Sequence, residues 1–223
     1  MAVEIIVVKA NKPSIVVLRR AARLLAKGKV IVCPTDTGYA FAANALDVKA
    51  VLKVFNLKGR SYSNPIHVAV DSIKAAEKYA RLNKAAELLA RSFLPGALTL
   101  VLPKKELMPP LLVAGLNTIG IRIPDNRVIL DLAALADLPI TATSANISGQ
   151  PPPYSAQEAI SQLGESIGNI ALVLDQGSLP ARGLSTIVDL TVSPPQLIRQ
   201  GLVSWLEIRQ VLQSIPDLDC EQT

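Results

Sequence analysis

The sequence contains little cysteine, histidine or aromatic side chain, and each shortage excludes a class of function. Cys33 and Cys220 are the only cysteines among 223 residues, so we expect neither a disulfide framework nor a zinc site. A reducing compartment suits this composition. The single histidine, His67, excludes a multi-histidine metal centre. Aromatic residues make up only 4% of the chain, which argues against extended stacking on single-stranded nucleic acid.

Long apolar runs and the common nucleotide-binding motifs are missing as well. The first apolar run is interrupted by Glu4 and ended by Lys9, a pattern typical of a strand rather than a signal peptide. Neither a Walker A pattern nor GxGxxG occurs, and no paired-carboxylate motif is found. The sequence therefore predicts a cytoplasmic protein without a membrane span, in which cations, hydroxyls and backbone amides hold anionic ligands.

The residues that are present favour one α/β domain with a mixed sheet. Half of the chain is hydrophobic, and strand-like and helix-like segments alternate, although some successive strands have no helix between them. The net charge of +5 is compatible with RNA or phosphate ligands without requiring them. Strands are expected at 3–8, 30–34, 65–70, 98–103, 119–124, 138–143, 170–174, 186–190 and 196–200. Helices are expected at 14–27, 47–58, 72–80, 83–93, 126–136, from Ser155, and from Ser204 to Leu212.

Two polar segments stand at the ends of predicted elements in the first third of the chain. PTDTGYAFAAN (34–44) follows a strand, and its hydroxyls and glycine suit either the close approach of a ligand or an ordinary polar turn. KGRSYSNPIHV (58–68) follows a helix. There Lys58 can meet a phosphate as a point charge and Arg60 as a bidentate fork, or Lys58 can simply complement the helix dipole.

Further polar groups recur at strand ends later in the chain. Arg122 lies among isoleucines in TIGIRIP (118–124), where it needs an anionic partner if buried and none if the strand is an exposed edge. TSANISG (143–149) crowds small polar residues behind a strand, and GLST (183–186) and RQG (199–201) repeat the pattern. Each segment alone is equally well explained as a turn or a surface charge.

Taken in order, these motifs resemble those of the YrdC family, the threonylcarbamoyl-AMP synthases. The matching segments are PTDTGYAF, KGRSYSNPIHV, PGALTLVLP, GIRIP, ATSANISG, LSTIVD and RQG, in family order and at similar spacing. The resemblance covers a YrdC-like domain at 14–201, to which residues 1–13, as an N-terminal strand, and 202–223, as a C-terminal helix and tail, would belong. It implies a single-domain, twisted open mixed sheet with surrounding helices and a concave basic cleft.

The resemblance also implies an activity and a set of partners. The chain would be a nucleotidyltransferase that makes L-threonylcarbamoyladenylate and diphosphate from L-threonine, bicarbonate and ATP. Mg²⁺ would accompany the nucleotide, and no protein residue is assigned as a metal ligand. A separate transferase would use the product for N6-threonylcarbamoyladenosine (t6A37) modification of tRNA, and direct contact with tRNA or double-stranded RNA is a further possibility.

Site residues follow from the resemblance motif by motif. Lys58 and Arg60 would stabilise charge developing at phosphorus. L-threonine would be surrounded by Thr35, His67, Arg122, Ala142 and Ser185. ATP would be bound by Lys58, Tyr62, Thr118, Ser144, Asn146, Pro152 and Arg199.

The sequence departs from the family pattern at Gly38-Tyr39-Ala40, Ser61, Leu184 and Gln200, without losing a cation. These departures leave open a second interpretation, a YrdC-like paralogue that binds RNA or nucleotide without activating threonine. A third, a carbamoyl-transfer domain from a larger maturation enzyme, is disfavoured because no zinc-finger or acylphosphatase-like segment is present.

Overall fold

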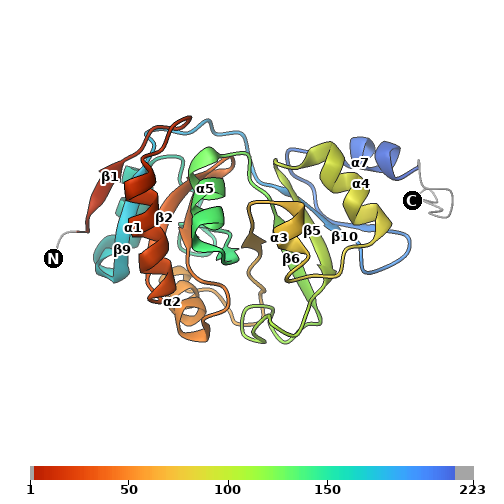
Figure 1. The fold of residues 1–223 in the computed structure, drawn as a ribbon, viewed down its shortest axis with the longest axis horizontal. Helices are drawn as coiled ribbons and strands as arrows, with labels where there is room; N and C mark the ends of the chain where they lie inside the picture. Colours follow the sequence, from red (N-terminus) through yellow and green to blue (C-terminus); the bar gives the residue numbers. More distant parts are fainter. Residues whose placement is uncertain (1–2, 214–223) are drawn as a thin grey trace.

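The computed structural model describes residues 3–213, and its strands form two mixed sheets that lie side by side (Figure 1). The single-domain α/β architecture expected from the sequence is confirmed, with the strands divided between two sheets instead of one large one. Parallel and antiparallel pairs occur in both sheets. The predicted tail, with Cys220, lies outside the described residues.

The first sheet has the strand order β1-β9-β2-β3-β8. Its central strand is buried along its whole length, as its run of apolar residues predicts. After β2 the chain turns and forms the antiparallel strand β3, which begins at Gly38. Part of the polar segment 34–44 is therefore a strand that hydrophobic periodicity did not predict. The strands of this sheet are β1 (Ile5–Val7), β2 (Val30–Thr35), β3 (Gly38–Ala42), β8 (Thr143–Ser144) and β9 (Ile170–Asp175).

The second sheet has the strand order β11-β10-β5-β6-β4-β7. Arg122 lies on β6, between β5 and β4, so its strand is interior and the edge-strand interpretation is wrong. The strands are β4 (Val68–Ala69), β5 (Leu98–Pro103), β6 (Thr118–Arg122), β7 (Ile140–Thr141), β10 (Thr186–Asp189) and β11 (Gln196–Arg199).

One segment, residues 140–144, passes from the second sheet to the first. The sequence predicts a single strand at 138–143, but Ala142 interrupts it, so that β7 belongs to one sheet and β8 to the other. The Ala142 amide donates to the His67 carbonyl at 2.8 Å, and the Ala145 amide donates to the Tyr39 carbonyl at 2.8 Å. The segment therefore ties both sheets together and brings their polar strand ends around one space.

The helices cover the sheets as the amphipathic patterns predict. Helices α1 and α5 pack together on the first sheet, where Leu18, Leu25, Ile31 and Leu132 are fully buried (Figure 1). Helices α4 and α7 pack together beside the second sheet. The helices are α1 (Ile15–Ala26), α2 (Val48–Lys58), α3 (Ile73–Ala76), α4 (Lys84–Phe93), α5 (Arg127–Ala136), α6 (Ala156–Leu163) and α7 (Trp205–Leu212), with a 3₁₀ helix at Gly164–Asn169.

The expected helix starts are confirmed. Asp47 caps α2 by accepting hydrogen bonds from the amides of Lys49 and Ala50 at 2.8 and 3.3 Å. Ser204 and Glu207 form a complete capping box that begins α7. Helix α2 matters most for the site, because its last residue is Lys58.

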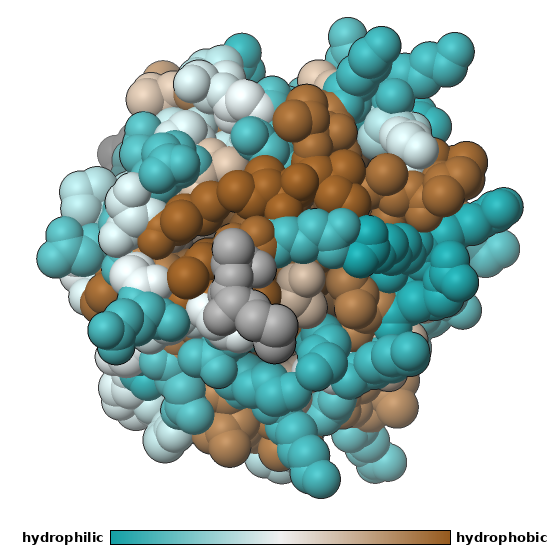
Figure 2. Space-filling model, turned by 90° about the vertical axis from the view of Figure 1, so that its left-hand side faces the viewer, coloured by the Kyte–Doolittle hydropathy of each residue, from teal (hydrophilic) through white to brown (hydrophobic). Residues whose placement is uncertain are grey.

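Part of the surface is apolar. An apolar band crosses the end of the molecule that carries β1 and α1 (Figure 2), where Ile5, Val7, Ile15 and Val16 are exposed. None of these four residues lines the pocket described below.

Between residues 3 and 213, no helix is both long and apolar enough to cross a bilayer.

Candidate functional site

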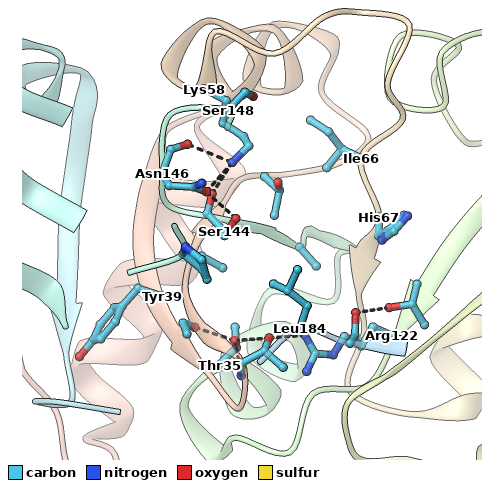
Figure 3. A pocket seen from close by; sticks show the side chains of 18 of the residues that line it. Thr35, Tyr39, Lys58, Ile66, His67, Arg122, Ser144, Asn146, Ser148 and Leu184 are labelled. Atoms are coloured by element: carbon cyan, nitrogen blue, oxygen red, sulfur yellow. Dashed lines mark hydrogen bonds between the residues drawn. The ribbon is translucent and has the colours of Figure 1, made fainter. Parts of the chain in front are cut away.

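A pocket of about 250 Å³ opens where residues of the two sheets and their connecting loops meet (Figure 3). Four cationic side chains line it, Lys58, Arg60, Arg122 and Arg199, and none of the residues that line it carries a carboxylate. The predicted site residues that line it are Thr35, Lys58, Arg60, His67, Arg122, Ala142, Ser144, Asn146, Pro152, Ser185 and Arg199.

Lys58 forms one wall of the pocket, and its side chain is buried. Its ammonium donates to the Ser144 carbonyl at 2.6 Å, to the Asn146 carbonyl at 3.0 Å and to Asn146 Oδ1 at 2.9 Å (Figure 3). Lys58 therefore does not cap its own helix, which instead ends at Gly59 in a left-handed conformation. Burial above all, with the positive charge of Arg60, lowers the pKa of Lys58 to about 7.

Asn146 organises the loop that Lys58 contacts. Its Oδ1 accepts from Ser144 Oγ at 2.5 Å, and its amide nitrogen donates to the carbonyls of Ile147 and Gln150 at 3.1 and 2.5 Å. The Ser148 amide donates to the Lys58 carbonyl at 2.8 Å, which closes the loop against the helix end. The SANIS segment is thus a folded loop fixed to Lys58, rather than an independent turn.

Arg60 holds the segment that follows α2. Its Nε donates to the Asn64 carbonyl and its Nη2 to the Pro65 carbonyl, both at 3.0 Å. Both bonds are to backbone oxygens and neither is to a carboxylate. Burial lowers the pKa of Arg60 from its usual range, and the group still carries its charge into the pocket.

Arg122 forms the opposite wall and is buried. Its Nη2 pairs with Asp36 Oδ1 at 2.6 Å, its Nη1 donates to Thr37 Oγ1 at 2.7 Å, and its Nε donates to the Gly96 carbonyl at 3.3 Å. Asp36 lies behind Arg122 and does not line the pocket. Sequence reasoning did not assign Asp36 a role, although the need of a buried arginine for an anion was a signal that could have found it.

Hydroxyls complete the wall around Arg122. Thr35 Oγ1 donates to the Gly38 carbonyl at 2.6 Å. Ser185 Oγ lies 3.0 Å from Thr99 Oγ1, and Arg199 Nη2 donates to the Ser185 carbonyl at 2.9 Å and to its Oγ at 3.1 Å. Thr37 and Thr99 are pocket residues that the sequence analysis missed, because a threonine in a turn or an apolar strand carries no signal of its own.

His67 directly precedes β4 and lies across the pocket from Ser144 and Asn146 (Figure 3). A methyl group on Gly120 would come within 2.4 Å of His67 Cδ2, so the ring packs directly on the glycine of β6. Burial chiefly, and then the charges of Arg199, Arg60 and Arg122, lower the pKa of His67 to about 4. The imidazole is therefore neutral at physiological pH.

Two of the predicted site residues do not line the pocket. Tyr62 is 51% exposed and stacks edge-on against Phe55, with ring centroids 5.2 Å apart, while its hydroxyl donates to Asn56 Oδ1 at 3.2 Å. Thr118 begins β6 opposite Pro103, at the end of the strand away from Arg122. Their contacts with ATP stay predictions.

The glycine displaced from the family pattern has a structural reason. Gly38 has φ = 122°, and a Cβ there would lie 2.8 Å from the Pro153 carbonyl oxygen. The Tyr39 amide donates to the same oxygen at 2.9 Å. The loop after β8 therefore packs directly against β3 at this glycine, next to Pro152 in the pocket wall.

Potential metal ligands are sparse in the part of the chain that the structure describes. Residues 3–213 contain no group of three or more His, Cys, Asp or Glu side chains that could hold a metal ion. Cys33 is a buried free thiol, and burial raises its pKa to about 12, so it is an inert apolar residue.

Comparison with known proteins identifies a family and several named relatives. The family model for Sua5/YciO/YrdC, described as telomere recombination, matches residues 23–201. A threonylcarbamoyl-AMP synthase of Pyrococcus abyssi is 40% identical over 199 residues, which are 89% of this chain and 58% of that protein. A threonylcarbamoyl-AMP synthase of Bacillus subtilis is 37% identical over 207 residues, or 92% of this chain and 58% of that protein.

A solved structure has a similar fold. The structure of Pyrococcus abyssi Sua5 complexed with L-threonine superposes with a TM-score of 0.88 at 39% identity, covering 93% of this chain and 60% of that one. The chain thus spans 58% of the length of both curated relatives named above. Because the family model matches most of the chain, this protein belongs to the Sua5/YciO/YrdC family.

Proposed function

We propose that this chain is a threonylcarbamoyl-AMP synthase, which forms L-threonylcarbamoyladenylate and diphosphate from L-threonine, bicarbonate and ATP. The observation that carries this proposal is the joining of two differently built walls in one pocket: Arg122 backed by Asp36, and Lys58 bonded to the loop 144–146. The names of the Pyrococcus and Bacillus relatives support it, as does the L-threonine bound in the Pyrococcus structure.

The Arg122 wall suits an amino acid. Three of the five N–H groups of Arg122 donate to Asp36, Thr37 and Gly96, which leaves two donors for a carboxylate. Thr35, Ala142 and Ser185 lie in the same pocket and offer two hydroxyls and one small apolar side chain. We assign L-threonine to this wall, with its carboxylate on Arg122.

The Lys58 wall suits a nucleoside triphosphate. Lys58, Arg60 and Arg199 supply positive charge, and Ser144, Asn146 and Pro152 supply hydrogen-bonding groups and a ring surface. Mg²⁺ would arrive bound to the phosphate oxygens of the nucleotide, because no carboxylate lines the pocket to hold it. Tyr62 is exposed and would have to approach by movement of the loop 60–65 to contact ATP.

Two displacements make up the reaction. The threonine amine attacks the carbon of bicarbonate, and loss of water leaves N-carboxythreonine. A carboxylate oxygen of that intermediate then attacks the α-phosphorus of ATP, and diphosphate leaves. Lys58 and Arg60 would stabilise the charge that develops on the phosphate oxygens, an effect that acts through positioning and electrostatics.

We place the reaction in the cytoplasm, upstream of a transferase that moves the threonylcarbamoyl group to tRNA. The overall charge of +5 is compatible with contact to tRNA or double-stranded RNA, and the family membership supports the link to t6A.

Isothermal titration calorimetry separates this proposal from a nucleotide- or RNA-binding paralogue. We expect L-threonine to bind at millimolar concentration or below, more tightly when ATP and bicarbonate are present, and L-threonine amide to bind more weakly because it lacks the carboxylate for Arg122. Absence of threonine binding, combined with salt-sensitive binding of RNA, would favour the paralogue instead.

A further inference from the structure

The proposed reaction needs a proton acceptor, and the pocket offers few. Threonine carries an ammonium group at neutral pH, and a protonated amine has no lone pair with which to attack bicarbonate. No carboxylate lines the pocket, and the one near it, Asp36, pairs with Arg122 and stands behind it. Hydroxyls such as those of Thr35 and Ser185 are too weakly basic to take this proton.

Lys58 does not fill the role. Burial lowers its pKa to about 7, but its nitrogen faces three oxygens of the loop 144–146 at 2.6 to 3.0 Å. A lone pair on that nitrogen would therefore point at one of these oxygens and not at threonine. Arginines do not accept protons in proteins, which removes Arg60, Arg122 and Arg199. Among the residues that line the pocket, His67 is then the remaining group with a nitrogen able to accept a proton.

The surroundings of His67 fit that task. Its ring rests on Gly120 and lines the pocket, and no hydrogen bond engages either ring nitrogen within residues 3–213. The register of β4 on β6 pairs Ala69 with Arg122, which puts His67 and Arg122 on the same face of the sheet. A threonine bound by its carboxylate to Arg122 would therefore lie beside the imidazole.

Burial first, and then the charges that face His67, keep it unprotonated before substrate binds. Arg60, Arg122 and Arg199 each disfavour the imidazolium in the empty pocket. Lys58 also lines the pocket, with its nitrogen on the loop 144–146, and Asp36 is paired with Arg122. The same positive charges would lower the pKa of a substrate ammonium. A bound triphosphate would offset the positive charge of the arginines and so raise the proton affinity of the imidazole.

We propose that His67 is a catalytic residue that accepts the proton of the threonine ammonium before attack on bicarbonate. This inference rests on the proposed function. The ammonium N–H bond breaks and its proton passes to a ring nitrogen of neutral His67. The freed lone pair forms the C–N bond, bicarbonate loses its oxygen as water, and N-carboxythreonine remains. His67 then returns its proton to solvent. The overall conversion is threonine plus bicarbonate to N-carboxythreonine, water and one proton.

The test compares His67→Gln with the wild-type chain in diphosphate release at saturating threonine. Between about pH 6 and 9 the wild-type rate should rise far less steeply with pH than the rate of His67→Gln, because His67 takes the ammonium proton, whereas the titration of Lys58 affects both proteins alike. His67→Gln should lose about 10²- to 10⁴-fold at neutral pH, and its rate should rise about tenfold per pH unit as free amine becomes available. ATP binding, measured by calorimetry, should be unchanged.

Gly120→Ala provides a second variant that keeps the histidine. Its added methyl would lie 2.4 Å from His67 Cδ2 and must displace the ring, so its rate should show the same rise with pH. A pH profile of His67→Gln that matches that of the wild-type chain, with the loss confined to the KM for threonine, would refute proton transfer and leave His67 a binding residue. Absence of product from the wild-type chain would refute the proposed function, and this inference with it.

Discussion

Lys58→Ala is expected to abolish threonine-dependent release of diphosphate from ATP. The Lys58 ammonium holds the carbonyls of Ser144 and Asn146 and the Asn146 side chain, so its loss removes a pocket charge and frees the loop that carries both residues. Removing one preorganised donor commonly costs about 10²- to 10³-fold in rate. Because the loop is released as well, we expect the rate of diphosphate release, measured by a coupled assay, to fall by at least about 10³-fold.

The same helix offers a matched control for Lys58. Lys53 also lies on α2 and donates one hydrogen bond, to the Gly28 carbonyl at 2.7 Å, but it does not line the pocket. Lys53→Ala should therefore keep the wild-type rate. Circular dichroism of both variants separates a local loss from unfolding, and a Lys58→Ala variant that keeps both its fold and its rate would show that the charge is not needed.

Arg122→Ala is expected to remove threonine binding and to destabilise the fold. Asp36 is only 11% exposed, and without Arg122 its carboxylate would be buried with no cationic partner. Breaking a buried ion pair on one side costs about 3–5 kcal/mol of unfolding free energy. Urea titration should detect that loss, while calorimetry should detect no heat from threonine at millimolar concentration.

A double variant separates these two effects. In Asp36→Ala/Arg122→Ala both charges are gone, so most of the stability should return, because removing both partners of a buried pair is far less costly than removing one. Threonine binding should stay absent, since the carboxylate has lost its guanidinium. Threonine binding by the stable double variant would contradict the role that we give to Arg122.

Local signals in the sequence predicted much of the fold. Asp47 and Ser204 begin helices because their side chains satisfy free backbone amides, a property that depends on a few neighbouring residues. Strand β3 was not predicted, because the polar residues between β2 and β3 resemble an ordinary turn, although the two strands form a tight antiparallel pair. The interruption at Ala142 was not predicted, because β7 and β8 pair with strands roughly 70 and 100 positions away. The division into two sheets has the same cause.

The site was predicted through its motif order more than through any single residue. Lys58 alone resembled a helix cap, and only the fold shows its ammonium on the loop 144–146. Asp36 escaped notice because its partner Arg122 is distant in sequence. Tyr62 and Thr118 lie outside the pocket wall, since motif position does not fix where a loop or a strand end lies in space.

The most direct test of the account is release of diphosphate from ATP by the wild-type chain, followed while threonine and bicarbonate are omitted in turn. We predict release only when all three substrates are present, with carbon from labelled bicarbonate recovered in an adenylate that also contains threonine. Release that ignores threonine, or binding of ATP without any turnover, would contradict the claim that this pocket activates an amino acid.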